Sequence, residues 1–237
     1  MRRLSIFSLA LGILWVMGCN KDDDTSLDTY TEDGLVAFYP FDGNALDHTE
    51  YSNHGEVSGP TLTSDRNQNE NSAYYFDGIN DVVLVKDSKE LYLNQNFTLN
   101  AWVKTDMVKT QQIIRKGAAV NGPHQWPYGL SMSGSGDIIF SITSTDGVLH
   151  QARKSGYEVN VWYMITGVLD DGMMHLYENG VLVKTIEMNG DIVDDPNPLL
   201  IGTRLRLPSS TFSGIMDEVR IYDRSLSSEE ILELYNE

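Results

Sequence analysis

The amino-acid sequence predicts an all-β protein, a two-sheet antiparallel β-sandwich that ends in a short C-terminal helix. About a dozen short apolar or alternating stretches recur along the chain between turn residues, and this spacing is typical of sandwiches. Asn179-Gly180 joins two of these stretches and is the strongest short signal for a β-hairpin. The regular alternation of strands and helices that a parallel sheet needs does not occur in the sequence.

The strands are predicted from period-two alternation of apolar and polar residues. Phe97 to Lys104, FTLNAWVK, is a clear example and reads as a central strand. The predicted strands are residues 35–41, 73–76, 81–85, 97–104, 111–116, 128–133, 137–143, 148–154, 161–169, 173–178, 181–187, 199–203 and 214–222. Residues 44–59 are rich in Asn, Asp, Ser and Gly, which predicts a long loop.

The helix is predicted from its capping residues. Ser227 is a suitable N-cap, and Glu229 and Glu230 lie in the first turn, where carboxylates are favourable. The apolar residues that follow, Ile231 and Leu234 among them, predict the face that packs on the sandwich.

The last predicted strand, GIMDEVRIY from Gly214 to Tyr222, contains one residue that breaks its pattern. Asp217 is in phase with Ile215, Val219 and Ile221, so a carboxylate is expected to point into the core. An unpaired buried charge is very unfavourable, so this carboxylate has to be ion-paired, hydrogen-bonded or bound to a metal.

The N-terminus predicts export. Arg2 and Arg3 precede a short apolar stretch that reads as a secretory signal, and Cys19 is the only cysteine in the chain. The residues around Cys19 resemble a bacterial lipobox, which implies that residues 1–18 are a lipoprotein signal peptide and that Cys19 carries lipid. The alternative is an ordinary signal with a chance cysteine.

Residues 19–33 are expected to form an acidic tether before a domain at residues 34–237. The run Asn20-Lys21-Asp22-Asp23-Asp24 resembles the surface-export signal of Bacteroidetes lipoproteins, which implies a cell-surface protein anchored in the outer membrane. The chain has 17 basic and 34 acidic residues, a net charge of −17, and loss of the signal makes it more negative by two. Such a surface repels nucleic acid and suits neutral partners and cations.

Several segments, in order, carry a resemblance to a known family: LVAFYPFDGNALD…SNHG, AYYFDGINDVV, FTLNAWVKT, VWYMITGVLDDGMMHLYENGVLV, IGT and SGIMDEVRIYDRSLSSEEI. Together they resemble the LamG-like jelly-roll family of the concanavalin A-like lectin/glucanase superfamily, from about Gly34 to Tyr235. One departure is Tyr163-Met164, where family members often carry two histidines. The resemblance implies two stacked sheets, one concave, with ligands on the concave face or the rim loops.

A structural calcium ion is expected where the resemblance brings the first and last strands together. Asp217, the turn residues Asp42 and Asn44, and the carbonyl of Gly78 would supply the oxygen ligands that calcium prefers. The alternative left open is that Asp217 accepts hydrogen bonds from turn amides or pairs with an arginine.

The sequence lacks the motifs of the common hydrolases. No strand carries two acids at the same-face spacing that a retaining glycosidase needs. There is no Gly-x-Ser-x-Gly elbow and no His-Glu-x-x-His zinc motif, and the five histidines are scattered. We therefore expect no catalytic residues, and an enzyme with an unrecognised site is the weakest hypothesis.

The best candidate for a ligand site is the stretch His124-Gln125-Trp126-Pro127-Tyr128. Neutral glycans stack on aromatic rings, and Trp126 lies in a loop where no strand position requires it. His124, Trp126, Tyr128 and Arg115 are the predicted ligand-binding residues, and Arg153 and Lys154 could line the same groove. The alternative is that Trp126 folds over the sandwich edge as a cap.

The sequence thus predicts a non-catalytic, cell-surface carbohydrate-binding module. The competing hypothesis is a protein-interaction or scaffolding module of a surface uptake or adhesion assembly, in which the partner is a surface protein.

Overall fold

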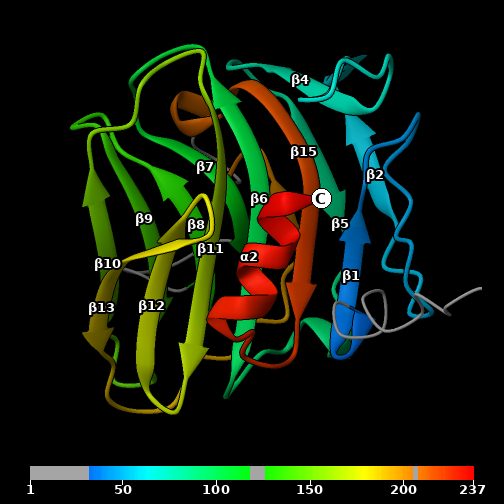
Figure 1. Ribbon diagram of the computed structural model, residues 1–237. Helices are drawn as coiled ribbons and strands as arrows, with labels where there is room; N and C mark the ends of the chain where they lie inside the picture. Colours follow the sequence, from blue (N-terminus) through cyan, green and yellow to red (C-terminus); the bar gives the residue numbers. More distant parts are fainter. Residues whose placement is uncertain (1–31, 118–125, 205–207) are drawn as a thin grey trace, which may run out of the picture.

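The computed structural model describes residues 32–117, 126–204 and 208–237, and it confirms the predicted sandwich of two antiparallel sheets (Figure 1). Sheet A has the strand order β13-β12-β11-β6-β15-β4-β3, and β1 also pairs with β15. Sheet B has the order β10-β9-β8-β7-β14-β5-β2. The strands are β1 (Leu35–Tyr39), β2 (Gly55–Ser58), β3 (Thr61–Thr63), β4 (Ala73–Asp77), β5 (Val82–Val85), β6 (Phe97–Thr105), β7 (Gln111–Lys116), β8 (Tyr128–Met132), β9 (Asp137–Thr143), β10 (Leu149–Ser155), β11 (Trp162–Asp170), β12 (Met173–Glu178), β13 (Val181–Glu187), β14 (Leu199–Ile201) and β15 (Ser213–Tyr222).

The prediction of one long loop over residues 44–59 was wrong at its end. Gly55–Ser58 forms β2, which pairs with β5 at the edge of sheet B. The strand has four residues, none of them buried, so it lacks the apolar alternation that marks a strand in the sequence. Its partner lies more than twenty residues further along the chain, and this pairing supplies what local sequence does not.

The main core lies between the two sheets and is aromatic at its centre. Phe97 of β6 contacts Tyr128 of β8 at a ring-centroid distance of 5.3 Å and Phe140 of β9 at 5.9 Å. All three side chains are fully buried, and each burial of this kind contributes roughly 1.5–3 kcal/mol. The alternating residues on β8 and β9 that face away from this core are therefore the ones that line the outer face of sheet B.

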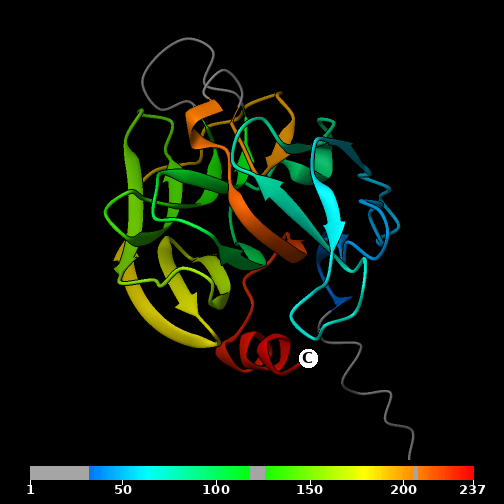
Figure 2. The ribbon, with the colours of Figure 1, turned by 90° about the horizontal axis from the view of Figure 1, so that it is seen from above.

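A second apolar cluster lies on the outer face of sheet A, under the helix α2 (Ser228–Asn236) (Figures 1 and 2). Ser227 and Glu230 form a reciprocal capping box, which confirms the predicted N-cap. Ile231 and Leu234 are fully buried against this sheet. Among the described residues, no helix combines the length and apolar character needed to span a membrane.

The strand β15 joins the two ends of the chain, since β1 pairs with it in the register Tyr39 to Val219. The predicted inward direction of Asp217 was wrong, because a β-bulge interrupts the alternation at Glu218, whose φ is +46°. The extra residue shifts the phase by one, so Met216 and Val219 both lie in the inter-sheet core. Asp217 is directed to the opposite face and is still only 2% exposed.

Candidate functional site

Polar side chains and one glycine line up across four strands of sheet B. Gln151 of β10, Ser141 of β9, Gly129 of β8 and Arg115 of β7 are successive register partners across the sheet. The next residue along β8, Leu130, lies in the inter-sheet core, so this row faces outwards. The outer face of sheet B therefore carries a polar row perpendicular to its strands.

A cavity of about 200 Å³ lies over this row, and we call it the outer-face groove. The residues that matter most in its lining are Gln112, Arg115, Trp126, Gly129, Arg153 and Arg204. Gly129 keeps the floor low, because a Cβ there would lie 2.7 Å from the carbonyl oxygen of Ile114. A cavity of this size fits one small group, such as a single sugar residue, rather than a drug-sized ligand.

Arg115 is the most unusual side chain in the groove. It points to the outer face of sheet B, yet it is only 2% exposed. The half-buried indole of Trp126 covers its guanidinium, with 3.9 Å between Arg115 Cζ and the ring centroid, which is a cation–π contact. Burial, and then the nearby charge of Arg204, lower the pKa of Arg115 to about 9, while Asp195 acts in the opposite direction.

Several N–H groups in this groove make no hydrogen bond. In the part of the chain that the structure describes, Nε and Nη2 of Arg115 and Nε of Arg204 are buried and have no partner. Leaving a buried donor unpaired costs about 1–3 kcal/mol, and more when it belongs to a charged group. The groove thus holds donors on two guanidinium groups that the chain itself leaves unsatisfied.

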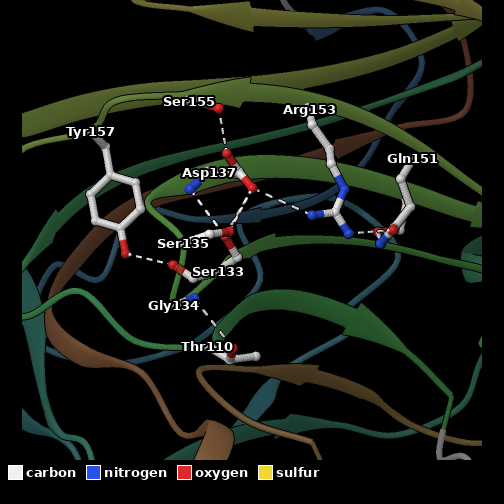
Figure 3. Close-up of polar contacts among 10 residues, drawn as sticks. Thr110, Ser133, Gly134, Ser135, Asp137, Gln151, Arg153, Ser155 and Tyr157 are labelled. Atoms are coloured by element: carbon white, nitrogen blue, oxygen red, sulfur yellow. Dashed lines mark hydrogen bonds and ion pairs between the residues drawn. The ribbon is translucent and has the colours of Figure 1, made fainter.

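A polar network holds Arg153 at the rim of the groove (Figure 3). Asp137 accepts hydrogen bonds from Ser155 Oγ at 2.5 Å and Ser135 Oγ at 2.8 Å, and these two bonds are the main cause of its lowered pKa. Arg153 Nη1 lies 3.4 Å from Asp137 Oδ2, and Nη2 donates to Gln151 Oε1 at 2.6 Å. Arg153 is therefore partnered and oriented, in contrast to Arg115.

The structure brings together two of the four predicted ligand-binding residues, Arg115 and Trp126. Tyr128 is a correction, because it is fully buried between the sheets and its hydroxyl donates to the carbonyl of Leu91 at 2.8 Å. It therefore offers no ring face to a ligand on the outer surface. His124 lies outside the described residues. Lys154 does not line the groove, since its Nζ is bonded to Glu178 at 2.8 Å.

The four predicted metal ligands do not form one donor set. Gly78 lies opposite Phe212 in the pairing of β4 with β15, about five residues or roughly 16 Å along the strand from Asp217. Its carbonyl accepts a hydrogen bond from Lys109 Nζ at 3.0 Å. Calcium ligands lie within about 2.6 Å of the ion, so Gly78 and Asp217 cannot share one.

The other predicted metal ligands have partners of their own. Asp217 Oδ2 lies 3.2 Å from Arg66 Nη1, which is the arginine pairing that the sequence left open. Asn44 bonds within its own turn, to the backbone of Asp42 and Leu46. Among the described residues, no group of three or more His, Cys, Asp or Glu side chains gathers to hold a metal. Calcium binding stays a prediction, and melting with and without a chelator tests it.

The chemistry of the groove suits binding. None of the described residues that line it carries a carboxylate, an imidazole or a thiol. Glycoside hydrolysis by the usual mechanism needs two carboxyl groups on either side of the scissile bond. The groove offers guanidinium groups, amides, hydroxyls and an indole, which recognise a sugar without cleaving it.

Sequence reasoning missed Gly129, Ser141, Gln151 and Arg204 as site residues. A signal for the first three was present, since small or polar residues alternate with buried apolar ones along β8, β9 and β10. Reading all three strands together would have predicted a polar row on one face. Arg204 follows β14, and no local pattern in the sequence links it to Arg115.

A second cavity, of about 290 Å³, lies at one end of the sandwich. It is enclosed by residues 91–95 and 191–194 and adjoins the core residue Tyr128. It is larger than the outer-face groove, but it contains neither Trp126 nor Arg115. We therefore take the outer-face groove as the candidate site.

Comparison with known proteins places this geometry in a wider context. The family model described as "Concanavalin A-like lectin/glucanases superfamily" matches residues 76–232. A curated relative, the adhesion G-protein coupled receptor V1 of Danio rerio, is 25% identical over 151 residues, which are 60% of this chain and 2% of the receptor. The chain thus spans only a small part of that relative.

Solved structures with the same fold are binding domains by their descriptions. Domain 4 of AbnA, an extracellular arabinanase from Geobacillus stearothermophilus in complex with arabinotriose, has a TM-score of 0.70 at 20% identity, covering 85% of this chain and 98% of that one. The binding domain of Paraclostridial Mosquitocidal Protein 1 has a TM-score of 0.71 at 17% identity, covering 87% and 52%. The botulinum neurotoxin serotype D binding domain has 0.69 at 18%, covering 89% and 52%. At these identities the likeness shows the fold alone.

Proposed function

We propose, since this chain belongs to the concanavalin A-like lectin/glucanase superfamily, that it is a non-catalytic module that binds carbohydrate in the outer-face groove. The observation that carries the proposal is the half-buried indole of Trp126 beside a polar row of hydroxyl, amide and guanidinium groups. An aromatic ring with polar groups around it is the usual chemistry of sugar recognition. The absence of carboxylates from the described lining favours binding over hydrolysis.

We also propose that the module is displayed on the cell surface as a lipoprotein of the Bacteroidetes type. This rests on the sequence of residues 1–24 alone, with the lipid on Cys19 and the anchor in the outer membrane. Labelling with a radioactive fatty acid tests it, because replacing Cys19 by serine should abolish incorporation of the label.

Replacing Trp126 by alanine is expected to weaken glycan binding about tenfold or more, because buried tryptophans at binding sites contribute about 2 kcal/mol or more. A panel of polysaccharides and oligosaccharides, with arabinotriose included as a probe, would first identify a ligand, and calorimetry would then give the affinities of both proteins. Trp162→Ala is the matched control, since Trp162 packs on sheet A, away from the groove, and should leave the affinity unchanged.

An unchanged affinity in Trp126→Ala would show that the sugar binds elsewhere. If no member of the panel binds and a partner protein is captured instead, the module is a protein-interaction domain and the carbohydrate proposal fails.

A further inference from the structure

We propose that the outer-face groove binds the carboxylate of an acidic sugar residue, such as a uronic acid, on the guanidinium groups of Arg115 and Arg204. This inference rests on the proposed function and deepens it, because it names the chemical class of glycan that the groove selects.

The first argument is the geometry of the unpaired donors. Nε and Nη2 of Arg115, the two nitrogens without a partner, lie on the same edge of the guanidinium plane. Their N–H groups are parallel, and this edge matches the two oxygens of a carboxylate in a bidentate pair. Arg204 Nε adds a third unpaired donor near the same site. A neutral hydroxyl group would satisfy only one of these donors at a time.

The second argument is the contrast with the other buried cations of the described chain. Lys116 is fully buried, and its Nζ lies 2.6 Å from Asp87 Oδ1. Arg220 is also buried, and its Nη1 lies 2.8 Å from Glu218 Oε2. Arg115 makes no ion pair of this kind, although a buried unpaired charge is strongly unfavourable.

Asp195 is the one acid with a resolved effect on Arg115, and it does not satisfy the free edge. It raises the pKa of Arg115, but less than burial and Arg204 lower it. Its own carboxylate accepts a hydrogen bond from the amide of Asn197. An anionic ligand group would therefore supply the counter-charge that Arg115 and Arg204 lack.

The third argument is that the groove can hold the rest of the sugar ring as well. Trp126 stacks on the guanidinium of Arg115, so an apolar face and a charged edge lie next to each other. The overall net charge of −17 does not prevent binding, because at physiological salt repulsion is screened beyond about 8 Å. Because Nε and Nη2 are closed to solvent, the ligand has to displace a lining side chain, and Trp126 covers them.

The test compares two ligands that differ only in charge. Calorimetry and tryptophan fluorescence would measure the binding of a short galacturonic acid oligosaccharide and of its methyl ester. We expect the acid to bind at least about tenfold more tightly than the ester, since a hydrogen-bonded charge pair contributes roughly that much. Binding of the acid should also change the fluorescence, and Trp126→Phe should remove that change.

Two variants assign the effect to the groove. Arg115→Met should remove the preference for the acid and should raise the melting temperature, because an apolar side chain replaces an unpaired buried charge. Arg115→Lys keeps the charge without the paired N–H edge, so it should keep only part of the preference. The control Lys86→Gln loses the same charge at an exposed position outside the groove and should behave like the unchanged protein.

The outcomes separate this inference from the proposed function. Equal affinity for the acid and its ester, or for neutral glycans alone, would overturn the carboxylate site and leave carbohydrate binding intact. A preference for sulfated over carboxylated sugars would also overturn it. No binding of any glycan would overturn both.

Discussion

Replacing Gly214 by alanine is expected to lower the free energy of unfolding by about 4 kcal/mol or more, among the largest effects of any single substitution. Gly214 has φ +135°, a conformation that residues with a Cβ rarely adopt. A Cβ at this position would lie 2.1 Å from the carbonyl oxygen of Lys104 and 2.8 Å from Thr105 Cα. Both contacts are with backbone, so no rotation of a side chain can relieve them.

The place of Gly214 in the sheet makes the clash hard to relax. It pairs with Thr105 of β6 on one side and with Phe76 of β4 on the other. Moving β15 away from one neighbour would push it into the other, so the strain would spread through the centre of sheet A. For a domain of this size, 4 kcal/mol corresponds to a fall of roughly 8–16 °C in melting temperature.

Urea denaturation and thermal melting would measure the effect of Gly214→Ala. Gly136→Ala is the matched control, because Gly136 also has a positive φ of +85° but no atom lies within 4 Å of its Cβ position. The control should cost only about 1 kcal/mol, from backbone strain alone. Equal losses in the two variants would show that the packing against Lys104 is unimportant.

Much of the fold could be predicted because its strands carry local signals. The predicted ranges for β7, β12 and β13 coincide with the observed strands, and the Asn179-Gly180 turn has the positive φ angles that its hairpin requires. The edge strand β2 was missed because its exposed residues show no alternation. Local pattern thus identifies strands with one buried face, and long-range pairing forms the rest.

The candidate site was only partly predictable, for a different physical reason. The residues of β7 are buried on both faces, so alternation does not show which of Arg115 and Lys116 points outwards. The two cations differ only in what other segments bring to them: Asp87 pairs with Lys116, and Trp126 covers Arg115. The bulge at Glu218 was hidden as well, because a glutamate gives no sign of a positive φ.

The carboxyl group of Asp217 is expected to make the protein less stable as the pH rises. Asp217 is 2% exposed, and its Oδ1 has no partner among the described residues. Burial is the main cause that raises its pKa to about 8; the neighbouring charges of Glu218 and Asp65 add to this, and Arg66 opposes it. The folded state therefore holds this proton more tightly than the unfolded chain, in which the pKa is about 3.9.

The sign of the effect follows from this difference in proton binding. The contribution of Asp217 to stability is complete below about pH 4 and is lost as the pH rises towards 8, at no more than about 1.4 kcal/mol per pH unit. Other carboxylates titrate in acid, so the comparison belongs between pH 5.5 and 8.5. Asp217→Asn has no proton to lose, so its advantage over the unchanged protein should grow by roughly 2–3 kcal/mol across that range.

Urea denaturation of both proteins at pH 5.5, 7 and 8.5 measures this difference directly. Arg66→Gln sharpens the result, because it removes the cation that lowers the pKa of Asp217 and leaves the carboxyl group in place. In that background, Asp217 should stay protonated to a higher pH, so the loss of stability should begin later. Parallel pH curves for the unchanged protein and Asp217→Asn would mean that Arg66 keeps Asp217 ionised throughout, as a conventional buried ion pair.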